Sequence, residues 1–258
     1  MVDAEAVREA VREAVRAWIL EFRGTYCREH GERPIWREPL VGLADADSPL
    51  FPGLRDIAYS GHRMPQDYLP GARTVISYFM PFTEDVPGDN TKGDRPVGSW
   101  TDAYNLTNEM CACMNRVIAS KVADMGYRAA VPEDAGEIVD GTYSVWSQRH
   151  VARIAGLGNF GMNGMLITDV GCAGRFFSVI TDIPCGHDEP CLEERCLHRI
   201  DGSCGRCMRV CPVSALNDDG FRRDACLGRC TDNMALIGQQ ICGKCLCGMP
   251  CSLRDPSA

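Results

Sequence analysis

The chain contains no apolar run near the ~18 residues that a membrane-spanning helix requires, so we expect no membrane partner. Its N-terminal segment is interrupted by charges throughout, which argues against a secretory signal peptide. The chain as a whole also has no excess of positive charge. The net charge of −8 argues against a nucleic-acid surface that relies on bulk electrostatics. We therefore expect a cytoplasmic protein without a nucleic-acid partner.

Cysteine, in contrast, is abundant. Ten of the sixteen cysteines lie between Cys196 and Cys251. In a chain without a secretory signal, a dense group of thiols is more often metal-binding or catalytic than disulfide-bonded. Exposed clusters and free thiols oxidise readily, so we expect an anaerobic source. The 258 residues suit one large domain, or one domain with a small appendage, and 45% hydrophobic content is ordinary for a globular protein.

The first cysteine run, residues 204–212, has the spacing C-x2-C-x3-C-P. In bacterial ferredoxins a run of this type places three thiolates on one 4Fe–4S cluster and sends the fourth, before proline, to a second cluster. Here the expected first ligand position holds Asp201, and Cys196 is the natural substitute. A second run consists of Cys242-x2-Cys245 followed by Cys251. The sequence therefore predicts two clusters.

The ligand assignment follows from the two runs. For the first cluster we predict Cys196, Cys204, Cys207 and Cys251. For the second cluster we predict Cys211, Cys226, Cys242 and Cys245. Cys230 competes with Cys226 for its position. Two four-cysteine zinc sites would use the same C-x2-C units and are the alternative.

Hydrophobic periodicity predicts an α+β fold around a mostly antiparallel sheet. Helices are predicted over residues 3–23 and 102–125, and strands over residues 74–79, 165–168 and 176–181. Residues 24–72 are interpreted as loops, with Cys27 and His30 at the surface. The polar segment 84–98 is long enough to form a lid or a substrate rim.

Residues 146–161 are rich in functional residue types and glycine. Ser147 can cap a short helix, and Gly156, Gly158 and Gly161 match the spacing of a dinucleotide fingerprint. The context is wrong for that fingerprint, because the glycines follow a helix and lead into a strand. We expect instead that they let the backbone approach a flat ligand closely.

At these residues the chain resembles the iron–sulfur proteins related to epoxyqueuosine reductase and the cobalamin-dependent reductive dehalogenases. The resemblance is carried by residues 69–76, 149–161 and 174–182 and by the two cysteine runs. It implies a nitroreductase-like domain over 1–183 that holds cobalamin. It also implies a ferredoxin-like domain over 184–258 that carries the two 4Fe–4S clusters.

The resemblance also implies site residues. The family's proton donor is an aspartate, whose position here is held by Thr142, with Asp140 two residues away. Candidate catalytic residues are Asp140, Tyr143 and His150. Candidate cofactor-binding residues are Arg149, Gly156, Leu157, Gly158, Phe160 and Gly161. The tRNA-acting relatives continue into helical repeats where this chain ends, which is a second reason to expect no nucleic-acid partner.

The resemblance therefore predicts a cobalamin-dependent reductase of a small molecule, fed through two 4Fe–4S clusters by a donor such as ferredoxin or flavodoxin. One alternative is an electron-transfer module that serves a redox partner protein and carries no corrinoid of its own. Another is flavin in place of cobalamin. By analogy with nitroreductase-like folds, a homodimer is also possible.

Overall fold

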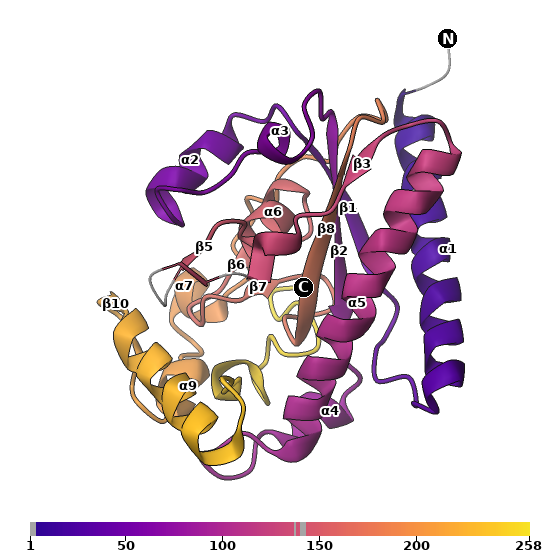
Figure 1. Ribbon diagram of the computed structural model, residues 1–258. Coiled ribbons are helices and arrows are strands. Elements are labelled where there is room, and N and C mark those ends of the chain that lie inside the picture. The colour runs from indigo at the N-terminus through magenta and orange to yellow at the C-terminus, as the bar shows by residue number, and fades with distance from the viewer. Residues whose placement is uncertain (1–3, 137, 140–142) are drawn as a thin grey trace. The chain divides into compact units, whose positions relative to one another are not determined.

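The computed structural model of the chain describes residues 4–136, 138–139 and 143–258 (Figure 1). The chain divides into two compact units, each assembled from segments that are far apart in the sequence. Unit 1 combines Met1–Met80, Asn108–Leu157 and Arg175–Cys191, and unit 2 combines Pro81–Thr107, Gly158–Gly174 and Leu192–Ala258. Within the described residues, no helix has both the length and the apolar character needed to cross a bilayer.

Unit 1 is organised by a four-stranded sheet with the order β1-β2-β8-β3. Its strands are β1 (Leu40–Asp45), β2 (Thr74–Pro81), β8 (Gly174–Thr181) and β3 (Ala129–Ala130). β1 runs antiparallel to β2, with Leu43 opposite Ile76, and β3 runs antiparallel to β8. The mixed helix-and-sheet architecture and the predicted strands at 74–79 and 176–181 are confirmed.

Helices cover both faces of this sheet, which is why every residue of β2 is buried. In Figure 1, α1 (Ala4–His30) and α5 (Gly98–Asp124) run along one side of the strands. Ile76 faces the apolar space that α1 and α5 line. Val75, on the opposite face, packs in the core cluster formed with α2 (Leu50–Ile57) and α6 (Gln148–Ile154).

The region 24–72 differs from the prediction, because it is not all loop. The first helix extends to His30, since its apolar stripe continues through Ile19 to Tyr26. Cys27 is consequently buried, and the ring of His30 stacks on that of Tyr26 with centroids 4.0 Å apart. The same region also contains β1, α2 and the short helix α3 (Pro65–Tyr68).

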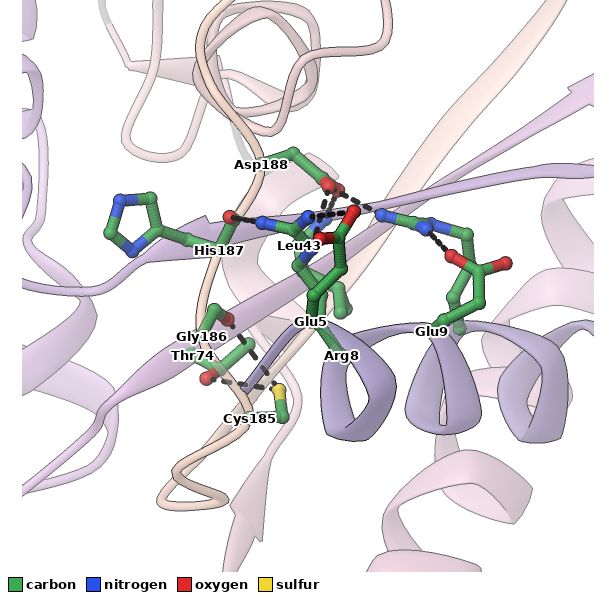
Figure 2. A network of polar contacts seen from close by, with 10 residues as sticks. Glu5, Arg8, Glu9, Leu43, Thr74, Cys185, Gly186, His187 and Asp188 are labelled. Atoms are coloured by element: carbon green, nitrogen blue, oxygen red, sulfur yellow. Dashed lines mark hydrogen bonds and ion pairs between the residues drawn. The ribbon is translucent and has the colours of Figure 1, made fainter. Parts of the chain in front are cut away.

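A polar network ties the segment after β8 to the first helix and the first strand (Figure 2). The carboxylate of Asp188 accepts the backbone N–H of Leu43 at 2.8 Å and pairs with the guanidinium groups of Arg8 and Arg12. All of these residues belong to unit 1. In the same view the buried thiol of Cys185 lies 3.5 Å from the hydroxyl of Thr74. Cys185 is therefore a packed thiol of this network.

Two short elements complete unit 1. A 3-10 turn, η1, spans Glu133–Gly136, and a small hairpin pairs β4 (Ile138–Val139) with β5 (Tyr143–Ser144). These elements directly precede α6 in the sequence, in the region that contains the predicted catalytic residues.

Unit 2 contains short elements joined by turns, and it carries both cysteine runs. It includes α4 (Asp85–Asp89), the hairpin of β6 (Asn159–Phe160) and β7 (Leu166–Ile167), α7 (Leu197–Asp201), α8 (Arg206–Val210), the hairpin of β9 (Leu216–Asn217) and β10 (Gly220–Phe221), α9 (Arg223–Ile237) and the 3-10 turn η2 (Lys244–Leu246). A small core of Cys207, Leu216 and Met249 lies among these elements.

Candidate functional site

The structure brings the predicted ligands of the first cluster together. Burial, followed by the neighbouring thiols of Cys251, Cys196 and Cys204, raises the pKa of Cys207 to about 11. The same four cysteines line one pocket of unit 2. A thiol surrounded by three others is suited to a metal centre, because the positive charge of the metal favours the thiolate form.

The predicted ligands of the second cluster also gather. Cys245 has a raised pKa, caused first by burial and then by the thiols of Cys242 and Cys226, with Cys207 and Cys211 contributing as well. Cys242 likewise has a pKa raised by burial and by Cys226 and Cys211. Four thiols from three separate stretches of unit 2 therefore share one neighbourhood.

Cys226 and Cys230 lie one turn apart on α9, and both face this neighbourhood. The pKa of Cys230 is raised first by its hydrogen bond with Cys226, then by burial and by Cys242 and Cys245. Residues at this spacing occupy the same face of a helix. The structure therefore places both thiols within reach, and the choice between them stays a prediction.

The two C-x2-C runs form turns of the same backbone shape. Gly205 has φ 73° and ψ 11°, and Gly243 has φ 77° and ψ 0°. Both are in the left-handed region that favours glycine. Each turn is followed by a short helical segment that carries the second cysteine of its run. In each turn a backbone N–H reaches a cysteine sulfur, that of Met208 at Cys207 and that of Lys244 at Cys242, and such N–H groups favour an anionic cluster.

Cys172, for which the spacing gave no role, supports one of the proposed ligands. Its backbone N–H donates to the carbonyl of Cys251 at 2.9 Å. Its sulfur lies 4.0 Å from that of Cys251, and this hydrogen bond lowers the pKa of Cys251. Asn163 fixes the arrangement from the side, donating to the carbonyl of Cys245 at 3.1 Å. A buried thiol and a buried amide thus orient this part of the second run.

No three Cys, His, Asp or Glu side chains stand close enough to hold a metal ion in their present rotamers, among the residues that the structure describes. The four thiolates of a 4Fe–4S cluster each bind a different iron and stand further apart than the ligands of one ion. The donor set of four cysteines in each group fits a 4Fe–4S cluster, and the zinc alternative uses the same donors.

The segment predicted as a lid is bound to the second cysteine run. The side chain of Asn90, which is fully buried, donates to the carbonyl of Cys242 at 3.1 Å and to the sulfur of Cys247 at 3.4 Å. The buried ammonium of Lys244 donates to the carbonyls of Asn90 and Lys92 at 2.8 and 2.7 Å. These contacts hold residues 84–98 in place, which argues against a lid.

Two of the predicted catalytic residues, Tyr143 and His150, lie around the start of α6. Asp140 lies outside the described residues. The ring of Tyr143, which is 38% exposed, stacks on that of Tyr59 with centroids 5.5 Å apart. The Nδ1 atom of His150 lies 2.7 Å from the hydroxyl of Ser147. His150 can therefore exchange a proton with a hydroxyl group, which is compatible with a proton-donor role.

A histidine that the sequence did not reveal positions this segment. His62 is buried, donates through Nδ1 to the carbonyl of Arg63 at 2.7 Å, and accepts the backbone N–H of Ser147 at Nε2. Because Nε2 accepts this N–H the ring is neutral, and burial, which lowers its pKa, favours the same state. It also stacks on Trp146, with centroids 5.6 Å apart. His62 thus fixes the residue that begins α6.

The predicted cofactor-binding block packs largely against the chain itself. A Cβ atom on Gly156 would lie 2.7 Å from the carbonyl oxygen of Glu189, and one on Gly158 would lie 2.2 Å from that of Ile167. Gly161 is similarly close to the side chain of Ile167, while Leu157 is buried. The close approach that these glycines permit is therefore to protein atoms.

Two members of that block are placed differently. Arg149 lies in the first turn of α6, and Phe160 lies in β6, where its carbonyl accepts a bond from Arg199 at 2.7 Å. Contact of the block with a cofactor stays a prediction.

Comparison with known proteins relates the chain to epoxyqueuosine reductases. It is 27% identical over 164 residues to that of Bacillus cereus, covering 60% of this chain and 39% of the relative. It is 26% identical over 207 residues to that of Bacillus subtilis, covering 74% and 50%. No family model matches. The chain therefore spans half or less of the length of these two curated relatives.

Solved structures show the same fold. A selenomethionine-labelled epoxyqueuosine reductase matches with a TM-score of 0.56 and 19% identity, covering 97% of this chain and 66% of that one. An epoxyqueuosine reductase solved with an epoxyqueuosine-modified tRNA-Tyr stem loop matches with a TM-score of 0.53 and 19% identity, covering 87% and 57%. A catabolic reductive dehalogenase in complex with 3-bromo-4-hydroxybenzoic acid matches with a TM-score of 0.56 and 20% identity, covering 84% and 30%.

These comparisons confirm the resemblance predicted from the sequence. They give no support to the expectation that nucleic acid is not a partner, because one structural relative was solved with a tRNA stem loop.

Proposed function

Given this relationship to epoxyqueuosine reductases, we propose that the chain is an iron–sulfur reductase that acts on a small molecule with the help of cobalamin. One 4Fe–4S cluster is held by Cys196, Cys204, Cys207 and Cys251. The other is held by Cys211, Cys226, Cys242 and Cys245. The clusters supply one-electron transfer from a donor such as ferredoxin or flavodoxin, and cobalamin supplies the reducing metal.

The convergence of the cysteines carries this proposal. In unit 2 the thiols of Cys196, Cys204 and Cys251 lie near Cys207, and those of Cys211, Cys226 and Cys242 lie near Cys245, with Cys207 and Cys230 also close to the second set. Two turns of matching backbone shape present four of these thiols, those of Cys204, Cys207, Cys242 and Cys245. A ferredoxin-like arrangement over 184–258 and a nitroreductase-like domain over 1–183 are part of the proposal.

In the same proposal, residues around α6 hold cobalamin and deliver the proton. The guanidinium of Arg149 is suited to donating hydrogen bonds to the phosphate and amide oxygens of cobalamin. His150, held near the Ser147 hydroxyl, and Tyr143 are candidates to release a proton to the substrate. Asp140 remains a third candidate for that role.

The experiment is an anaerobic metal analysis before and after the addition of hydroxocobalamin. We expect about eight irons per chain and broad absorption near ~400 nm. We also expect about one cobalt per chain after gel filtration. Cys207→Ser and Cys245→Ser should each lose one cluster. If both variants keep about eight irons, the ligand assignment is wrong. Zinc in place of iron would refute the clusters themselves.

Cobalt analysis separates the reductase from the alternatives. Iron without cobalt or flavin favours an electron-transfer module with a stable partner complex. Bound flavin favours the alternative in which flavin takes the place of cobalamin. The protein should also be offered an epoxyqueuosine-modified tRNA stem loop, because a structural relative was solved with one. Turnover of that stem loop would refute the small-molecule substrate and leave the reductase intact.

A further inference from the structure

Trp100, in the first turn of α5, packs directly on the second C-x2-C turn. The residue is only 4% exposed. A Cβ atom on Gly243 would lie 2.5 Å from Cε2 and Cζ2 of the indole and 2.6 Å from its Nε1. The nitrogen-bearing edge of the ring therefore lies against the backbone between Cys242 and Cys245. A contact this short leaves no room for a side chain at residue 243. Both segments belong to unit 2.

A second aromatic ring keeps the indole in this orientation. Phe82 packs edge-on to Trp100, with centroids 5.6 Å apart and the ring planes at 76°. An indole held on one side by Phe82 and on the other by Gly243 has little freedom to turn its N–H elsewhere.

The indole N–H is nevertheless unsatisfied. Nε1 of Trp100 is buried and has no hydrogen-bond partner among the residues that the structure describes. Buried polar groups in proteins are nearly always paired, and the indole nitrogen can only donate. A group that occupies this region when the protein is loaded would supply the missing acceptor. Thiolate and sulfide sulfur atoms of a cluster on this turn are acceptors of that kind.

We propose that Trp100 donates its indole N–H to a sulfur atom of the cluster bound by the second C-x2-C turn, and that this bond raises the cluster's reduction potential. The inference rests on the proposed function, because it requires the cluster. Reduction adds an electron to an already anionic centre, and a hydrogen bond to its sulfur stabilises the more negative state.

The other C-x2-C turn has different neighbours. A Cβ atom on Gly205 would first meet Cε of Met208 at 3.0 Å, with Nδ1 of His198 at 3.6 Å. Unit 2 contains no tryptophan other than Trp100, because Trp18, Trp36 and Trp146 all belong to unit 1. The effect of Trp100 should therefore be confined to one of the two clusters.

The test is Trp100→Phe in the anaerobic, fully loaded protein, with each cluster titrated by electron paramagnetic resonance. Phenylalanine keeps an aromatic ring and removes the donor. We expect one midpoint potential to shift to more negative values and the other to stay unchanged. Trp146→Phe is the matched control, because the indole of Trp146 already donates to the hydroxyl of Ser178 at 2.9 Å. Neither potential should move in that control.

A second measurement covers the case in which Trp100→Phe fails to assemble its clusters. Wild-type protein labelled with nitrogen-15 in its indoles is reduced, and the spin echo of the cluster is examined for a nitrogen-15 coupling. A coupling is expected from Trp100. Loaded wild-type protein without it, or unchanged potentials in Trp100→Phe, would overturn this inference and leave the clusters intact. A wild-type protein that binds no iron overturns the proposed function, and this inference with it.

Discussion

Replacing Asp188 with alanine should destabilise unit 1 strongly, since this carboxylate joins three elements. The change leaves the N–H of the fully buried Leu43 without its acceptor at 2.8 Å, which costs about 1–3 kcal/mol. It also removes the ion pairs with Arg8 and Arg12. The side chains of Asp188, Arg12 and Arg8 are 21%, 23% and 29% exposed, so solvent screening limits these pairs to roughly 0.5–1 kcal/mol together. The expected total loss is about 1.5–4 kcal/mol.

Urea unfolding followed by tryptophan fluorescence measures this loss, because three of the four tryptophans belong to unit 1. Asp188→Asn keeps an acceptor for Leu43 and loses only the charge, so it should cost about 1 kcal/mol. Glu9→Ala is the surface control: it removes an Arg12 partner that is 54% exposed and should cost less than ~0.5 kcal/mol. A loss in Asp188→Asn as large as in Asp188→Ala would refute the assignment of most of the effect to Leu43.

Two further predictions concern packing and pH. Gly42→Ala should cost roughly 1–3 kcal/mol, because its Cβ would lie 2.2 Å from the carbonyl oxygen of Ala155. A Cβ atom on Gly53 in α2 would meet nothing within 4 Å, so Gly53→Ala should stabilise the protein by about 0.5–1 kcal/mol. Equal effects of the two substitutions on the free energy of unfolding in urea would contradict this argument. His62 has a pKa below 6.5, so the unfolded chain binds its proton more readily, and stability should fall as pH falls below 6.5 and level off above it. A pH series should show a weaker slope for His62→Gln, and an identical slope would refute the role of this residue.

Features that repeat locally could be predicted from the sequence. The strands β2 and β8 are dense runs of apolar residues, and the x2 spacing of the cysteines fixes a turn wherever it occurs. β1 was missed because Gly42 interrupts its apolar pattern, and this glycine is needed for the close contact with Ala155. His62, Asn90 and Trp100 could not be found in this way. Each acts through one contact with a distant segment, and a single residue carries no periodicity.

The dependence of the second cysteine run on residues 84–100 has a consequence for biosynthesis. The turn that carries Cys242 and Cys245 is held or covered by Asn90, Trp100 and the carbonyl of Lys92. These three residues are translated long before the two cysteines. A fragment cut at residue 184 would keep every ligand and lose these supports. The cysteine-rich end is therefore not a module that can be transplanted alone. Because residues 84–100 precede the second run in the chain, its supports are already synthesised when Cys242 and Cys245 emerge from the ribosome.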